Sequence, residues 1–282
     1  MPLAGLALEQ FRNYASAELA LDAGLTIVAG PNGSGKTNLL EAVWVTVTGR
    51  SHRSGPDQEL VRHGAPLARV RLYVAGPGVE ATRVELVIPG VDAPADLRKR
   101  LTINGLARRQ SSLTDTVRAV LFRPEEMLLL VGSPGERRRF LDGIVAQRTR
   151  GAAHDQAELS RILAQRNALL RAIRGEEADP GLLDFWDDQL ATVGGRVMAA
   201  RLHLVDELSE RLPPLHGAIA PAEEQGNQVA VGYLDTLKDA WPGRDHRERG
   251  PEALSAALRR RIVSARQKEV WHGMSLDRKS VV

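Results

Sequence analysis

Residues Gly30–Thr37 read Gly-Pro-Asn-Gly-Ser-Gly-Lys-Thr and fit the pattern G-x-x-x-x-G-K-[ST]. Glycines let such a loop curl with its N–H groups pointing inward, where they can meet phosphate oxygens. The lysine can reach the β and γ phosphates, and the threonine hydroxyl can ligate Mg²⁺. The pattern predicts a site for ATP and Mg²⁺ formed by Gly30, Pro31, Asn32, Gly33, Ser34, Gly35, Lys36 and Thr37, with Thr37 as the metal ligand.

The residues on either side of this loop fit the setting that the motif needs. Leu25–Ala29 is a short apolar run before the loop and is predicted to be a strand. A helix is predicted to begin near Lys36, with its positive dipole end toward the phosphates. Its apolar residues share one face, namely Leu40, Val43, Trp44 and Val47.

Apolar residues recur with period two through the first third of the chain, which is typical of strands. Two such runs, Val70 to Val74 and Val84 to Ile88, lie on either side of Gly76-Pro77-Gly78 and predict a hairpin. Further strands are predicted at Leu3–Phe11, Ala17–Leu21, Leu101–Ile103 and Val117–Phe122.

After Pro124 the apolar spacing changes to three and four residues, which predicts long amphipathic helices. The first is expected to begin at Ser133-Pro134, since serine is a good N-cap and proline suits the first helical position. A break is expected at Glu176–Pro180, and Pro213-Pro214 is expected to end the third helix. Val229, Val231 and Tyr233 predict a return to sheet, and Leu254, Leu258 and Ile262 a last helix.

These patterns predict an α/β fold in which helices are inserted between two parts of a sheet-bearing domain. The expected domains are a head with the phosphate loop at 1–132, a helical part at 133–215, a return toward the head at 216–276, and a short tail at 277–282.

Composition narrows the class of protein. The 282 residues are 43% hydrophobic, as expected for a chain with a buried core. The formal net charge is only +3, although arginine outnumbers lysine, so an acidic partner is suggested but not required. There is no cysteine, which excludes disulfides and thiolate sites, and no signal peptide or membrane span is evident. We therefore expect a cytoplasmic protein without a membrane partner.

A hydrolytic enzyme of this class needs a carboxylate at the end of an apolar strand, which holds Mg²⁺, and a group that positions water. No run of four apolar residues followed by Asp or Glu comes after the loop, and Leu182-Leu183-Asp184 lies inside a helical pattern. A Ser-Gly-Gly-Gln signature is also missing. The sequence therefore predicts that this chain binds ATP weakly at most and does not hydrolyse it.

Several separate patches resemble the RecF family of bacterial recombination mediators, which belongs to the ABC-type ATPases together with the SMC proteins. They occur in the family's order and span residues 1 to about 276. The patches are Phe11–Tyr14, Gly35–Ala42, Ser51–Arg53, Ile103–Gly105, Phe122–Glu125, Gly132–Pro134, Arg137–Asp142 and Gln165–Leu170.

The resemblance implies an ABC-type ATPase head (lobe I) with a helical lobe II, an ATP-dependent homodimer, and a weak DNA-dependent ATPase in the intact family. It implies binding to single-stranded and double-stranded DNA near their junctions, partnership with RecR and RecO, RecA loading at gaps, and a link to the SOS response. It further implies that Arg12 and Asn13 approach the nucleotide and that Arg137–Arg139 and Arg259–Arg261 contact DNA phosphates.

The chain departs from the family after Gly273–Leu276, where members continue into a Gly-Pro-His-Arg-Asp segment, the signature loop and the Walker B strand. Here Asp277–Val282 follows instead. Codons GAT CGG AAG AGC GTC GTG would spell the start of a sequencing adapter, so we expect these six residues not to be native.

Two other interpretations of the loop stay open at this point: a transporter-type ABC ATPase subunit, and a P-loop kinase for a small metabolite with a helical lid. DNA binding that responds to ATP would favour the RecF-like interpretation over both.

Overall fold

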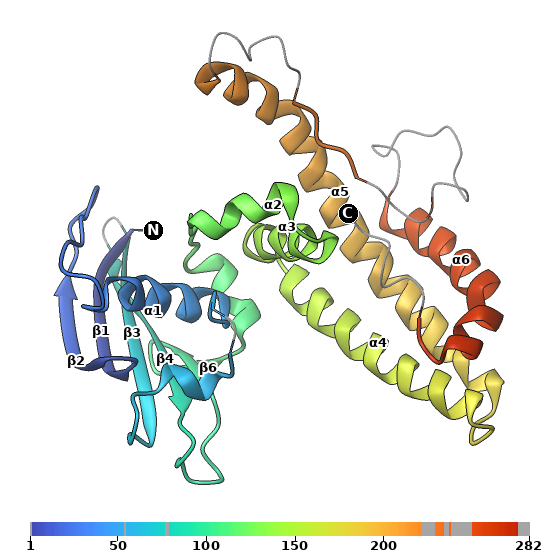
Figure 1. Ribbon diagram of the computed structural model, residues 1–282, viewed down its shortest axis with the longest axis horizontal. Coiled ribbons are helices and arrows are strands. Elements are labelled where there is room, and N and C mark those ends of the chain that lie inside the picture. The colour runs from blue at the N-terminus through green and yellow to red at the C-terminus, as the bar shows by residue number, and fades with distance from the viewer. Residues whose placement is uncertain are drawn as a thin grey trace. The chain divides into compact units, whose positions relative to one another are not determined.

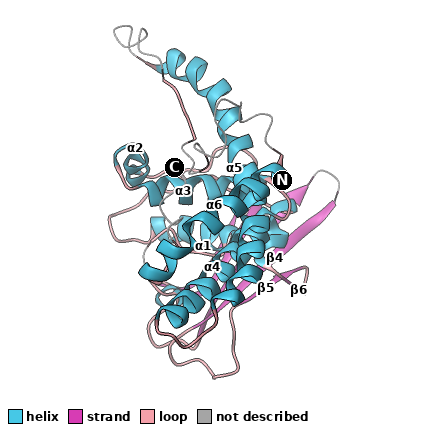
Figure 2. Cartoon of the chain, turned by 90° about the vertical axis from the view of Figure 1, so that its right-hand side faces the viewer, coloured by secondary structure: helices cyan, strands magenta, loops and turns pink. Residues whose placement is uncertain are grey.

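A computed structural model of the chain describes residues 2–53, 55–76, 79–220, 229–233, 237 and 250–275. The chain divides into two compact units, Met1–Phe122 and Arg123–Val282. All strands of the described residues belong to the first unit, and the second unit is helical (Figures 1 and 2). The predicted α/β class is confirmed, while the expected domain limits at 132, 215 and 276 stay predictions.

The first unit is an antiparallel sheet with a helix on one face (Figure 1). The strand order is β2-β1-β3-β4-β5-β6. The helix α1 begins directly after the phosphate loop and packs against the central strands. The bounds are β1 Leu3–Phe11, β2 Tyr14–Ala20, α1 Lys36–Thr48, β3 Leu67–Gly76, β4 Val79–Pro89, β5 Arg100–Ile103 and β6 Leu106–Arg108.

The alternation seen in the sequence separates the two faces of this sheet. Val70, Leu72 and Val74 of β3 are at most 1% exposed and form the core beneath α1. Arg69 and Arg71, which alternate with these residues, lie on the opposite face and pair with Glu9 and Glu85. The predicted hairpin is confirmed by the pairing of β3 with β4, and the strands predicted at Leu3–Phe11, Ala17–Leu21 and Leu101–Ile103 overlap β1, β2 and β5.

Two predicted strands are wrong. Leu25–Ala29 and Val117–Phe122 are outside any strand, and they carry exposed apolar side chains, with Leu25 89% and Val120 99% exposed. Each run has the composition of a strand. However, neither pairs with a neighbouring strand within the described residues, and a strand exists only where its backbone groups meet those of a partner.

The second unit consists of helices packed side by side. They are α2 Leu128–Val131, α3 Pro134–Arg148, α4 Ala152–Arg174, α5 Leu183–Ile219 and α6 Pro251–His272. The start of α3 is confirmed: Ser133 is its N-cap, and the Ser133 N–H donates to Glu136 Oε2 at 2.7 Å. The break between α4 and α5 and the last helix are also confirmed.

Two predictions for this unit are wrong. Pro213 and Pro214 do not end α5, which continues to Ile219. Both prolines are exposed, so water can satisfy the carbonyls that lose a donor, and the fixed φ of proline is itself compatible with a helix. Residues 229–233 form no strand; Tyr233 is buried against the helices, and Ser209 Oγ donates to Val231 O at 2.8 Å.

Helices α5 and α6 approach each other closely at Gly195. A Cβ on this glycine would meet Ser255 Oγ, Pro251 O at 2.7 Å and Ser255 N at 2.8 Å. Two of these three atoms belong to the α6 backbone and cannot rotate away. The neighbouring Gly194 would meet only Leu258 Cδ1, at 3.2 Å.

We expect Gly195→Ala to lower the free energy of unfolding by about 1–3 kcal/mol, because the overpacking outweighs the gain in helix propensity. The matched variant Gly194→Ala should be neutral or stabilising, since the Leu258 side chain can shift. Urea denaturation of both variants measures the difference. Equal stabilities for the two variants would contradict the close approach of α5 and α6.

Candidate nucleotide-binding site

The phosphate loop ends in a helix start that is open to an anion. Gly33 and Gly35 have φ of 80° and 101°, conformations that glycine adopts without strain. Gly35 is the N-cap of α1; it offers no side-chain cap, and the first turn holds no acidic residue. The first N–H groups of α1 therefore face outward with the positive end of the helix dipole, which favours phosphate.

Lys36 lies folded over its own loop. Its Nζ donates to Gly30 O and to Pro31 O, each at 2.7 Å. Gly30–Ser34 and Thr37 are exposed. The ammonium group is thus held over the loop by two carbonyls, and the Thr37 hydroxyl in the first turn of α1 is accessible.

Asn13 braces the loop from the β1–β2 turn. Asn13 Nδ2 donates to Ser34 O at 3.2 Å, and Asn38 Nδ2 donates to Asn13 Oδ1 at 2.8 Å. Arg53 extends this chain by donating to Asn38 Oδ1 at 3.0 Å. A Cβ at Gly35 would lie 2.6 Å from Asn13 Nδ2, so the asparagine side chain sits directly against the loop.

Arg12 is turned away from the loop and toward Glu41 of α1. Its Nε and Nη2 donate to the two Glu41 carboxylate oxygens at 3.0 and 2.8 Å, and its Nη1 donates to Glu59 O at 2.8 Å. Ser51 Oγ donates to the same carboxylate at 2.6 Å, and Arg53 lies 3.3 Å from it. Arg12 thus joins β1 to α1 behind the phosphate loop.

Glu41 stays ionised although its side chain is fully buried. Burial by itself raises the pKa of a carboxyl group, but the hydrogen bonds from Arg12 and Ser51 and the charges of Arg12 and Arg53 outweigh it. The pKa of Glu41 therefore lies below its ordinary value. This carboxylate holds Arg12, Arg53 and Ser51 beside the first turns of α1.

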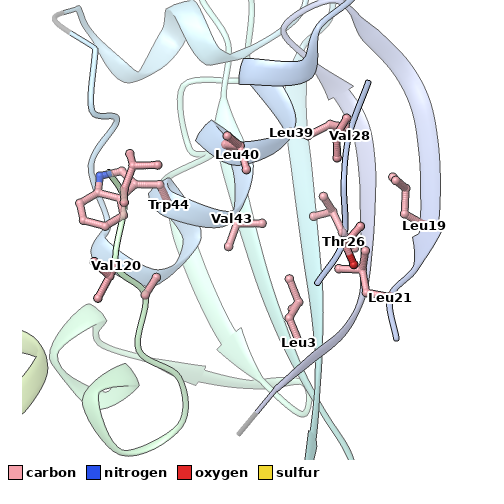
Figure 3. Close-up of a pocket in the computed structure, with 13 residues that line it drawn as sticks. Leu3, Leu19, Leu21, Thr26, Val28, Leu39, Leu40, Val43, Trp44 and Val120 are labelled. Atoms are coloured by element: carbon pink, nitrogen blue, oxygen red, sulfur yellow. The ribbon is translucent and has the colours of Figure 1, made fainter. Parts of the chain in front are cut away.

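An apolar cavity of about 240 Å³ lies beside the segment that leads into the loop (Figure 3). Val28 and Thr26 of that segment line it together with Leu40, Val43 and Trp44 of α1. Val120 and Leu121, from the unpaired run Val117–Phe122, also line it. With so few polar groups this cavity is unsuited to phosphate.

The structure brings the predicted residues Gly30–Thr37 and Asn13 together, and it places Arg12 behind them. Sequence reasoning did not single out Glu41, Asn38 or Arg53. All three lie in the patches that carry the family resemblance, so the patches were the available signal. The residues Arg137–Arg139 and Arg259–Arg261 lie in the second unit, where Arg137 Nη1 donates to Gly132 O and Arg259 pairs with Asp188.

The described residues hold no group of three or more His, Cys, Asp or Glu side chains that could form a metal cage. A loop hydroxyl is instead suited to Mg²⁺ that arrives with a nucleotide, because this ion keeps waters and phosphate oxygens as most of its ligands. Within the same residues, no helix combines the length and apolar character that a membrane crossing requires.

Comparison with known proteins shows the family to which this chain belongs. Residues 6–116 match the family described as AAA domain. The chain is 36% identical to the DNA replication and repair protein RecF of Streptomyces avermitilis over 98% of this chain and 72% of that protein, and equally so to RecF of Frankia alni.

Solved structures give the same fold. A structure of the recombination mediator protein RecF with ATPrS superposes with a TM-score of 0.85 at 22% identity, covering 98% of this chain and 70% of that chain. A RecF–ATP structure superposes with a TM-score of 0.84 at 23% identity, covering 97% and 69%. The extent of the sequence match over both chains shows that this chain belongs to the RecF family of DNA replication and repair proteins.

Proposed function

We propose that this chain binds ATP with Mg²⁺ at Gly30–Thr37 and takes part in DNA repair as a recombination mediator of the RecF type. The observation that carries the proposal is the uncapped start of α1 behind two glycines with positive φ, with Lys36 poised over it. The solved RecF structures are named for their ATP and ATPrS ligands, which supports the same ligand here.

On binding, Lys36 Nζ would leave Gly30 O and Pro31 O for the β and γ phosphates, and the backbone N–H groups of the loop would contact phosphate oxygens. Thr37 would supply its hydroxyl to Mg²⁺. Asn13 would hold the loop in shape through Ser34 O. Arg12 is paired with Glu41 and would not contact the nucleotide; it would act only by holding α1 and the loop in place.

We further propose the finer features of the family for this chain: an ATP-gated homodimer, DNA binding at single-strand gaps and junctions, RecR and RecO as partners with RecA downstream, a link to the SOS response, and action in the cytoplasm. The RecF names of the relatives support this direction. They do not favour a transporter subunit or a small-molecule kinase.

ATP binding is tested with a fluorescent ATP analogue and Mg²⁺. Lys36→Ala should weaken binding at least about tenfold, since it removes a charge that faces the phosphates. Lys268→Ala, an exposed lysine on α6, is the matched control and should bind as the parent chain does. Equal affinity of the Lys36 and Lys268 variants would reject the site. Gapped DNA with and without ATP then tests the mediator role.

A further inference from the structure

Strands β5 and β6 form a short hairpin at one edge of the sheet. They are joined by Asn104 and Gly105, whose φ values of 50° and 81° are those of a tight type I′ turn. Leu101 opposes Arg108, so the two ends of the hairpin lie together. The hairpin sits near the C-terminal end of α1, because Gln110 donates to Thr46 O and Val47 O there. The phosphate loop is at the other end of the same helix.

This hairpin carries an unusual concentration of positive charge. Residues 98–110 contain five cations and no acidic residue, whereas the whole chain has a net charge of only +3. Lys99 is neutralised, since it donates to Asp57 at 2.7 Å and to Gly49 O. The other four are exposed and have no carboxylate partner in the part of the chain that the structure describes; these hairpin arginines are Arg98, Arg100, Arg108 and Arg109.

The cations extend along the sheet edge rather than gathering at one point. Arg100 opposes Val87 of β4, and the backbone of Arg83 on the same strand exchanges two hydrogen bonds with Asn104, each 2.8 Å long. Val87 and Arg83 are four positions apart along the strand, which is about 13 Å. The exposed guanidinium of Arg83 therefore prolongs the row past the turn. A DNA duplex presents about eight phosphate charges over that length.

Protection of a sheet edge from pairing is the ordinary reason for charge on an outer strand. The opposite edge of the same sheet argues against this as a full explanation, because β2 is also an edge strand and its seven residues carry one charge, Glu18. On the face of the sheet opposite α1, Arg69 and Arg71 are paired with Glu9 and Glu85. Among the described residues of this sheet, the β5–β6 edge is thus where arginines gather without matching carboxylates.

We propose that the hairpin arginines form a contact surface for the DNA phosphate backbone, in addition to any contact made by Arg137–Arg139 or Arg259–Arg261. Guanidinium groups on a rigid hairpin suit phosphate oxygens, and they carry no sequence preference. The inference rests on the proposed function, since the RecF relatives are named DNA replication and repair proteins. Its location at the far end of α1 keeps this surface apart from the nucleotide loop.

The test is the salt dependence of binding to a short fluorescent DNA duplex, measured by anisotropy between about 50 and 200 mM salt. The variant R98Q/R100Q/R108Q/R109Q should bind about tenfold more weakly or worse. The slope of log K against log salt should fall by about 0.9 for each DNA phosphate that the variant no longer neutralises. The control R62Q/R161Q/R171Q/R211Q removes the same charge from exposed arginines elsewhere and should keep the parent slope.

The outcomes separate this inference from the proposed function. If the parent chain binds duplex and the hairpin variant keeps its slope, the surface is refuted while the mediator role stands. If the parent chain does not bind DNA, both fail. Aggregation of the variant with an unchanged slope for its soluble fraction would assign the arginines to edge protection instead. Preferential binding to anionic vesicles would identify a membrane surface and also overturn the proposal.

A lysine variant is the control for misfolding of the glutamine variant. R98K/R100K/R108K/R109K keeps the four charges and should keep most of the salt slope, since lysine meets phosphate as a point charge. Binding of the fluorescent ATP analogue should be unchanged in the glutamine and lysine variants, because the loop is at the other end of α1. Loss of duplex binding in the lysine variant with intact ATP binding would contradict a phosphate surface.

Discussion

Replacing Arg166 by methionine is expected to lower the free energy of unfolding of the helical unit by about 3–5 kcal/mol. Arg166 of α4 is fully buried, and its guanidinium donates to Asp187 Oδ1, Ser275 Oγ and Glu269 Oε2, each at 2.7 Å. Asp187 is on α5 and Glu269 is on α6. One side chain thus ties three helices and Ser275 together in the interior.

The loss of stability arises because the substitution leaves two buried carboxylates without their positive partner. Methionine fills much of the space, but the Glu269 and Asp187 carboxylates, 2% and 0% exposed, lose the buried positive charge that compensates them. Asp187 keeps Arg266, whose Nη2 lies 2.6 Å from Asp187 Oδ2, so the damage should centre on the α4–α6 contact. Hydrogen exchange of peptides from α4 and α6 measures the loss where it occurs.

Two further variants isolate the charge effect. Arg161→Met, on the same helix, removes a guanidinium that is 61% exposed and 3.9 Å from Glu158, so it should cost under about 1 kcal/mol. The double variant R166M/E269M removes both members of one buried pair and should recover part of the stability lost in R166M. Equal exchange in R161M and R166M would show that the buried cluster does not hold the helices together.

Replacing Glu41 by glutamine is expected to lower the free energy of unfolding of the sheet unit by about 2–4 kcal/mol at neutral pH. The amide can accept only part of the hydrogen bonds that the carboxylate accepts from Arg12 and Ser51, and it leaves the charges of Arg12 and Arg53 unopposed. Glu18→Gln, on an exposed position of β2, is the control and should change little.

The effect of Glu41 should depend on pH. The pKa of Glu41 is lower in the folded chain than in the unfolded one, so the group stabilises the fold fully above the ordinary carboxyl pKa of about 4.3. That contribution is lost as pH falls through the lowered pKa of the folded state. The stability difference between the parent chain and E41Q should therefore shrink under acid, as measured by denaturation at stepwise lower pH. A constant difference would mean that Glu41 is not the titrating group.

Local patterns in the sequence were sufficient for much of the fold. Period two over β3 and β4 and helical spacing after Pro124 are properties of a few neighbouring residues, and both were predicted correctly. The phosphate loop belongs to the same class, because its glycines, lysine and threonine act within eight residues. Leu183 and Asp184 lie in a helix, as their pattern predicts, because α5 begins at Leu183. Asp184 pairs there with Arg266.

The wrong predictions of secondary structure concern segments whose conformation depends on a second part of the chain. Leu25–Ala29 and Val117–Phe122 have the composition of strands, but a strand requires a partner, and composition does not say whether one is present. Val231 and Tyr233 alternate as a strand would, yet their side chains pack on helices. Pro213 and Pro214 continue a helix because the surroundings are exposed, which is a tertiary property.

The sequence by itself determined the α/β class and the family, and it predicts the phosphate loop, since each depends on residue types within short segments. Only the tertiary structure showed that Arg12 pairs with Glu41, that Asn13 donates a hydrogen bond to Ser34 O, and that Arg166 joins three helices. Those partners are separated by 29, 21 and up to 103 residues. No local pattern pairs charges over such separations, because the pairing depends on how sheet and helices pack.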